Sequence, residues 1–156
     1  MINWKNQILI ILGLVNISIL LSAYFIQYVL KIPPCAMCYY QRIPYYLATA
    51  VIFLALFKIV NFRTLFSILI LLSLISISLG LYHVGIEQGF LSELNSCSNN
   101  IKVDDTANLL KELQKQSVVS CKDISFKIFG LSLAAINSIT SVVLMLIYWL
   151  ILKYEK

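Results

Sequence analysis

The sequence predicts an all-α integral membrane protein in which four transmembrane helices form a bundle. The 156 residues are 60% hydrophobic and only 12% charged, with a mean hydropathy of +0.88, a composition far from that of a soluble domain. Four stretches contain no charged residue, namely 6–30, 43–57, 64–86 and 128–152. Because a helix needs about 20 apolar residues to cross the hydrocarbon core, three of these stretches can span it unaided. The whole chain, 1–156, is therefore expected to be one membrane domain.

The first predicted helix covers residues 7–30. Its apolar stretch is longer than the roughly 7–15 residues of a signal-peptide core, so we expect it to be retained rather than cleaved. The second predicted helix, 42–60, has a short charge-free run. It reaches membrane length if Arg42 and Lys58 extend their side chains to opposite interfaces. The remaining two helices are predicted at about 64–83 and 128–152.

Four spans place both termini on one side of the membrane, with a short loop at 31–41 and a long loop at 84–127 on the other. Basic residues flank the spans on the side of the termini: Lys5, Lys58, Arg63, Lys153 and Lys156. The long loop also contains lysines, but acidic residues offset them, and long loops cross membranes largely regardless of charge. We therefore expect cytoplasmic termini and external loops. The net charge of +5 lies mostly beside the membrane and requires no nucleic-acid partner.

All four cysteines fall in the two loops that are predicted to be external. Cys35 and Cys38 form a CxxC motif, in which one helical turn brings two sulfurs together as in redox dithiols. Cys97 and Cys121 bracket much of the long loop. This usage fits an oxidising compartment such as a bacterial periplasm. The position of the CxxC motif beside a membrane segment indicates electron transfer from a water-side thiol to a lipid-soluble acceptor.

Arg42 follows Cys38 by four residues, so a helix that includes both would place the guanidinium one turn from the sulfur on the same face. There it could stabilise the Cys38 thiolate or an oxygen of a reduced ligand; the alternative is an interfacial anchor. Pro33 and Pro34 suit the start of such a helix. Tyrosines also gather near this end of the first three helices, either as interfacial anchors or as walls of a site for a flat aromatic ligand. They are Tyr24, Tyr28, Tyr39, Tyr40, Tyr45, Tyr46 and Tyr82.

Two alternatives to a redox role of the cysteines must be considered, a structural zinc site and static disulfides. A structural zinc site takes four ligands, often as two close pairs, but Cys97 and Cys121 are separated by 23 residues, so no metal site is expected. A static disulfide remains open for this loop pair. A bond within the CxxC motif closes too small a loop to restrict the unfolded chain much, and therefore suits redox exchange better.

Part of the long loop carries a helical pattern. Leu109, Leu110 and Leu113 recur at helical spacing after residues 104–106, whose sequence Asp-Asp-Thr can cap a helix. Either a short amphipathic helix on the membrane surface or an ordinary solvated loop accounts for this pattern.

Three stretches of the chain resemble the disulfide bond formation protein B (DsbB) family. They are PCAMCYYQR at 34–42, LYHVGIE at 81–87, and the segment 121–137, which includes FGLSL and Asn137. The resemblance covers nearly the whole chain and includes the helix order and the order of the cysteine pairs. It implies a bacterial inner-membrane oxidase that regenerates a soluble, periplasmic thioredoxin-fold donor of the DsbA type and passes electrons to ubiquinone or menaquinone.

The resemblance also implies roles for individual residues. Cys97 would form the mixed disulfide with the donor, Cys121 would be its loop partner, and electrons would then pass to Cys35 and Cys38. Cys38 would face the quinone, with Arg42 helping to hold it. His83 matches a histidine near the quinone in relatives; the alternative is an interfacial histidine satisfied by the backbone.

Three alternative functions remain open. A transporter that imports a reductant would bury its cysteines within the spans, whereas these lie at helix ends and in a loop. A vitamin K epoxide reductase-like enzyme is also a small helical quinone oxidoreductase, but its CxxC motif follows the loop cysteines, which is the reverse of the order here. A structural membrane protein with disulfide-stapled loops would hold its cysteines permanently oxidised. Thiol trapping in cells distinguishes a quinone-linked enzyme from a structural protein. The cysteines of an enzyme change their oxidation state with the quinone supply, whereas structural disulfides stay oxidised.

Overall fold

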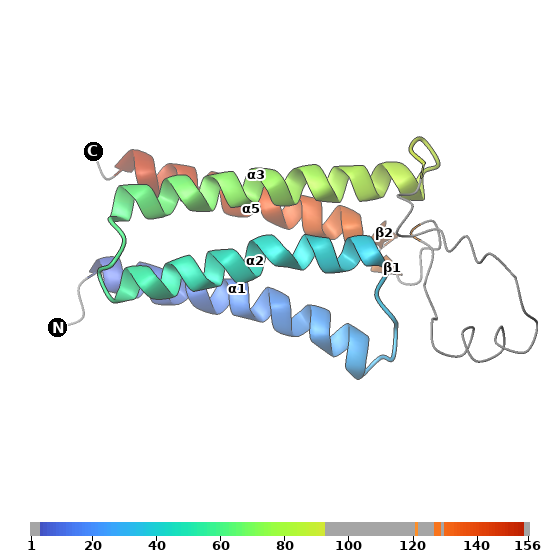
Figure 1. Ribbon diagram of the computed structural model, residues 1–156, viewed down its shortest axis with the longest axis horizontal. Helices are drawn as coiled ribbons and strands as arrows, with labels where there is room; N and C mark the ends of the chain where they lie inside the picture. Colours follow the sequence, from blue (N-terminus) through green and yellow to red (C-terminus); the bar gives the residue numbers. More distant parts are fainter. Residues whose placement is uncertain (1–3, 93–120, 122–126, 129, 155–156) are drawn as a thin grey trace, which may run out of the picture.

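The computed structural model describes residues 4–92, 121, 127–128 and 130–154. In these residues four helices form an antiparallel bundle (Figure 1), and the predicted all-α fold is confirmed. The helices are α1 (Trp4–Tyr28), α2 (Ala36–Leu56), α3 (Phe62–Glu87) and α5 (Leu133–Tyr154). Two short strands, β1 (Lys127–Ile128) and β2 (Leu131–Ser132), pair antiparallel just before α5.

The ends of the helices differ from the predicted segments for local backbone reasons. α2 begins at Ala36 rather than near residue 42, because the helix extends through the first turn after the two prolines. It ends at Leu56 rather than near 60, because Lys58 adopts a left-handed conformation with φ of 59°. α3 continues past residue 83 to Glu87. α5 starts at Leu133 rather than at 128, since the hairpin occupies the preceding residues and the Ser132 hydroxyl accepts the Ala135 N–H.

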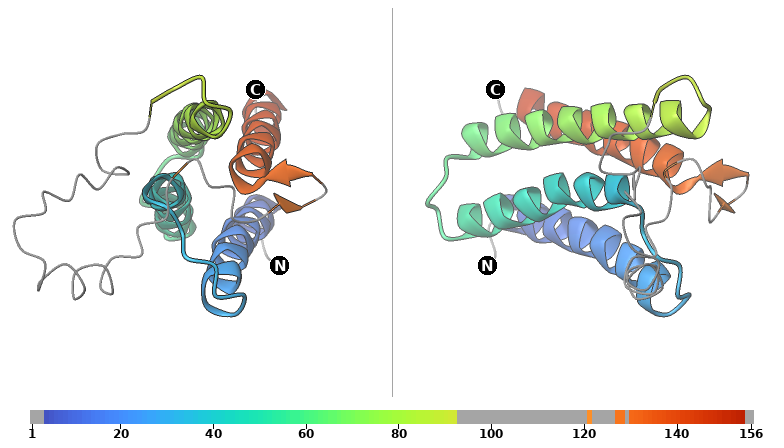
Figure 2. Two further views of the ribbon diagram at one scale, coloured as in Figure 1. Left: turned by 90° about the vertical axis from the view of Figure 1, so that its right-hand side faces the viewer. Right: turned by 45° about the vertical axis from the view of Figure 1, so that its right-hand side comes forward.

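The helices pack in a continuous order around the bundle. α3 lies between α2 and α5, and α1 packs against α2, as the end-on view in Figure 2 shows. Gly80 permits the close approach of α3 to α5, because an added Cβ would meet the side chain of Ser138. Both chain ends and the turn between α2 and α3 lie at one end of the bundle, and the start of α2 lies at the other (Figure 1).

The bundle has a packed interior and an apolar exterior. Leu65, Phe66 and Leu69 of α3 are completely buried, and Phe66 packs edge-on against Tyr148 of α5. Inside this core, the amide nitrogen of Asn16 donates to the Tyr148 hydroxyl at 3.0 Å, which satisfies both polar groups. α1, α3 and α5 are long and apolar enough to cross a membrane, and large apolar side chains cover their outer faces.

Candidate active site

The CxxC motif forms the first turn of α2. Cys35 caps this helix: its backbone is extended, and its sulfur accepts the N–H of Cys38 at 3.3 Å. The Sγ atoms of Cys35 and Cys38 lie 2.8 Å apart and share a hydrogen bond. Cys35 is 6% exposed. The cap therefore fixes two thiols within reach of each other at the end of the bundle that lies away from both termini.

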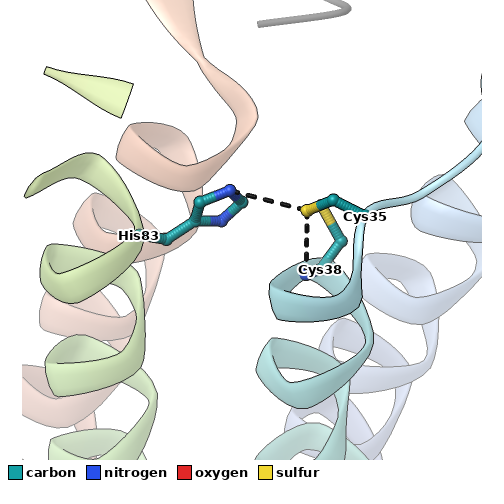
Figure 3. A group of neighbouring side chains, drawn as sticks. All are labelled: Cys35, Cys38 and His83. Carbon is teal, nitrogen blue, oxygen red and sulfur yellow. Dashed lines mark hydrogen bonds between the residues drawn. The ribbon is translucent and has the colours of Figure 1, made fainter. Parts of the chain in front are cut away.

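His83 of α3 reaches across to this pair (Figure 3). Its Nε2 atom lies 3.5 Å from the sulfur of Cys35, and its Nδ1 atom lies 3.1 Å from the amide nitrogen of Gln41. The same amide nitrogen donates to the carbonyl oxygen of Leu79. Because the Gln41 nitrogen is a donor, Nδ1 accepts and the proton of a neutral imidazole lies on Nε2, facing Cys35.

Glu87 completes this side of the site, one helical turn beyond His83. Its Oε1 atom lies 3.8 Å from Nε2 of His83, and its side chain is only 7% exposed. Glu87 ends the family-like segment LYHVGIE at 81–87, but no role in a site was expected for it from the sequence. The spacing of four residues from His83 within a continuing helix is the signal that would have placed it here.

The surroundings of Cys35 keep its thiol protonated. The hydrogen bond with Cys38 and burial together raise the pKa of Cys35 to about 12, against the smaller opposing effect of His83. The thiol of Cys35 is therefore the hydrogen-bond donor of the pair, and the sulfur of Cys38 is the acceptor. This division of roles makes Cys38 the more reactive sulfur of the reduced pair.

The raised pKa of Cys35 predicts how the reduced protein reacts with an alkylating agent. Because only the thiolate reacts, the rate of labelling at Cys35 should rise about tenfold per pH unit between pH 7 and 10 without reaching a plateau. Mass spectrometry of peptides labelled by iodoacetamide over this range measures the rate. A plateau below pH 9 would contradict the assigned hydrogen-bond direction. Free cysteine in the same buffers gives the control curve.

Arg42 lies on the other side of the CxxC motif. Its Nη1 atom donates to the side-chain oxygen of Gln27 in α1 at 2.7 Å, and its guanidinium lies over the rings of Tyr24 and Tyr39 at 5.3 and 5.4 Å from their centroids. No carboxylate among the described residues pairs with it. The guanidinium is therefore held in place from several directions while its charge stays available to a ligand.

Cys121 joins the CxxC motif from a distant part of the chain. It is 2% exposed and belongs to one buried cluster with Cys35, Met37 and Ile86. The structure thus brings three of the four cysteines together. Cys97 lies outside the described residues, as does the segment 104–116 in which a surface helix was a possible interpretation.

A cavity of about 360 Å³ connects these groups. It lies between all four helices at the CxxC end, and most of its wall is apolar, as in sites for small organic ligands. Its polar lining consists of Ser22, Gln27, Cys35, Cys38, Gln41, Arg42, Tyr45, His83, Glu87, Cys121, Asn137 and Thr140. Of this set, the cysteines, Arg42, His83 and Tyr45 were expected near a site from the sequence. Gln41 and Asn137 lie in the segments 34–42 and 121–137 that carry the family resemblance, but no role was assigned to either. Gln27 lies in no motif, and helix packing brings it here.

The same geometry bears on metal binding. Ligand atoms of Cys35, Cys38 and His83 all lie within 4.8 Å of one another, so the group could hold an ion. Among the described residues this group offers three ligand atoms, one fewer than a structural zinc site takes.

A dithiol with one buried sulfur shares a cavity with a histidine, an arginine and a further cysteine at one end of an apolar helix bundle. These features define a membrane thiol oxidoreductase. Comparison with known proteins agrees with this class. The family model described as "Disulfide bond formation protein DsbB" matches residues 5–151, and the chain belongs to this family of multi-pass membrane proteins. The chain is also 30% identical over 155 residues to "Uncharacterized protein RP370" of Rickettsia prowazekii (strain Madrid E), covering 97% of this chain and 88% of the relative.

Proposed function

We propose that this protein re-oxidises a soluble thioredoxin-fold donor of the DsbA type and transfers the electrons to a membrane quinone. The observation that supports this most directly is the shared cavity, which is lined by Cys38, Arg42, His83 and Cys121. A donor of the DsbA type is strongly oxidising, at about −120 mV, so only a better acceptor can regenerate it. A quinone coupled to respiration meets that need.

The reaction begins in the long loop. A thiolate of the reduced donor attacks the Cys97–Cys121 disulfide and forms a mixed disulfide with Cys97. The second donor thiol then releases the oxidised donor and leaves Cys97 and Cys121 reduced. Cys121 next passes the two electrons to the Cys35–Cys38 disulfide by thiol–disulfide exchange. Burial of Cys121 in one cluster with Cys35 supports this step, because exchange requires contact between the sulfurs.

The reduced CxxC pair then returns to a disulfide. A quinone in the cavity supplies the chemistry of an acceptor for two electrons and two protons. Cys38 presents its sulfur beside Arg42, while the neighbouring thiol of Cys35 closes the disulfide and loses its proton. The second proton that the quinone takes up comes from the Cys38 thiol or, where that thiol is ionised, from water. Nε2 of His83 faces both Cys35 and Glu87, so it can pass its own proton to the Glu87 carboxylate as it accepts the proton of Cys35.

The cavity fits a quinone headgroup by chemistry as well as by size. Its wall is mainly apolar, and Arg42 supplies a charged hydrogen-bond donor for a ring oxygen. Tyr24 and Tyr39 hold the guanidinium rather than the ligand. Both ubiquinone and menaquinone carry the required pair of ring oxygens.

We further propose a bacterial inner-membrane location with cytoplasmic termini and periplasmic cysteine loops. The termini lie at the end of the bundle opposite the CxxC motif (Figure 1), and the basic residues Lys58, Arg63 and Lys153 belong to that same end. This arrangement follows the usual excess of positive charge on cytoplasmic loops and exposes the thiols to an oxidising compartment.

The purified protein tests the proposal directly. With a reduced thioredoxin-fold donor and decyl-ubiquinone or a menaquinone analogue, we expect one quinone to be reduced per donor dithiol oxidised, because each step moves two electrons. The rate should exceed that without protein by at least about 100-fold. Quinone absorbance and donor thiol content give the two measurements. Protein alkylated after reduction is the control; donor oxidation without quinone reduction would contradict the proposal.

A further inference from the structure

Asn137 of α5 is one of the residues that line the cavity, and its amide nitrogen is an unused hydrogen-bond donor. Its Oδ1 atom accepts a hydrogen bond from the Tyr45 hydroxyl at 2.8 Å, and its Nδ2 atom is buried without any partner among the described residues. A buried polar atom left unpaired costs stability, and most such atoms in proteins are paired. The amide nitrogen therefore has the properties of a ligand-binding group.

A chain of hydroxyl groups fixes the orientation of this amide. Ser76 of α3 and Ser141 of α5 are linked at 2.8 Å, and Ser141 is linked to Tyr45 of α2 at 2.8 Å. Since Tyr45 gives its only proton to Asn137, Ser141 must donate to Tyr45 and Ser76 to Ser141. Each bond in such a series strengthens the next. Residues of three helices thus fix the position of Oδ1 of Asn137. The two protons on Nδ2 take no part in this series of hydrogen bonds.

We propose that the Nδ2 group of Asn137 donates a hydrogen bond to a ring oxygen of the quinone, so that Asn137 and Arg42 both bind the oxidised headgroup. This inference rests on the proposed function for the identity of the ligand. A quinone carries two acceptor oxygens and no donor, which complements a cavity that offers an amide N–H and a guanidinium. Asn137 thereby selects for ring carbonyls and gives weaker binding to an apolar ring of the same size.

The unpaired state of Nδ2 in the free protein provides a test that separates binding from structure. Replacement of Asn137 by leucine removes the buried unpaired donor together with the acceptor of the Tyr45 proton, and Tyr45 can turn that proton to Ser141. Because one hydrogen bond and one unpaired buried donor are lost together, the stability of the variant should stay close to that of the natural protein, and yet the variant should bind quinone more weakly. A residue with a merely structural role would show the opposite pattern, a lower stability with unchanged affinity.

The experiment measures decyl-ubiquinone affinity and thermal unfolding of the quinone-free protein in detergent. We expect N137L to bind about tenfold more weakly, equivalent to about 1.4 kcal/mol, with an unfolding midpoint close to that of the natural protein. Thr49→Val is the matched control. Thr49 of α2 is not among the residues that line the cavity, and its hydroxyl donates to the Tyr45 carbonyl at 2.8 Å, so the affinity should not change. Asn137→Ala serves as a second variant and should show the same loss of affinity.

The outcomes are distinguishable from a failure of the proposed function. Unchanged affinity in both Asn137 variants, with turnover by the natural protein intact, would overturn this inference alone. Binding of decyl-ubiquinone without turnover would overturn the proposed electron transfer, while the affinity comparison would still decide the role of Asn137. No binding of decyl-ubiquinone by the natural protein would overturn both. An equal loss of affinity in Thr49→Val would also count against the inference, because it would indicate a general disturbance of the bundle.

Discussion

Replacement of Cys38 by serine should reduce quinone-dependent donor oxidation at least about 100-fold, to the rate without protein. A hydroxyl cannot form the disulfide with Cys35, so the two electrons that arrive at the CxxC motif have no covalent route onward, and loss of a reacting nucleophile typically has effects of this size. The assay follows quinone absorbance with a saturating reduced donor. Full turnover by this variant would disprove the role of Cys38.

The Cys38→Ser result can be separated from unfolding. Decyl-ubiquinone affinity should stay within about threefold, because Arg42 and the apolar wall of the cavity are unchanged. Cys35→Ser is a matched variant, since its hydroxyl can still accept the N–H of Cys38 and cap α2; it too should lack turnover. In Cys38→Ser, alkylation of Cys35 should become faster at pH 8, because the hydrogen bond that most raises the pKa of Cys35 is lost.

The sequence could predict those parts of the molecule that depend on composition and short spacing. Long charge-free stretches are sufficient to predict helices in a bilayer, and the CxxC motif, Arg42 and His83 each carry a recognisable chemistry. The ends of the helices were less predictable. Charge at Arg42 suggested a membrane boundary, but a helix can continue through a charged residue, and α2 begins before it at Ala36.

Other parts of the site depend on contacts between helices that a single sequence does not reveal. Gln27 became part of the site only because α1 packs beside α2 and brings its amide to Arg42. Asn137 ends the segment 121–137 that carries part of the family resemblance, but that segment does not by itself distinguish a ligand group from a packing group. Its partner Tyr45 was included in the tyrosine group with two interpretations, interfacial anchor or site wall. The structure places Tyr45 in the wall of the cavity, 5% exposed.

A second large effect is expected from Arg42→Gln, which should weaken decyl-ubiquinone binding by roughly 10- to 100-fold. A hydrogen bond from a charged donor contributes about 1.5–3 kcal/mol, and about 1.4 kcal/mol corresponds to a factor of ten in affinity. The Michaelis constant for quinone should rise by a similar factor, while that for the donor protein should not change. Steady-state assays in which each substrate is varied in turn, together with direct binding, measure these effects.

Arg63→Gln distinguishes a ligand-binding arginine from an interfacial anchor. Arg63 is an exposed cation at the opposite end of the bundle, so its removal should leave quinone affinity unchanged, and equal losses in the two variants would argue for a general electrostatic effect. Arg42→Lys should restore only part of the affinity, because a lysine keeps the charge but not the planar pair of donors. Gln27→Leu, which removes the hydrogen bond that orients the guanidinium, should cause a smaller loss than Arg42→Gln. That ranking follows only if Arg42 acts by direct contact with the ligand and Gln27 acts through Arg42.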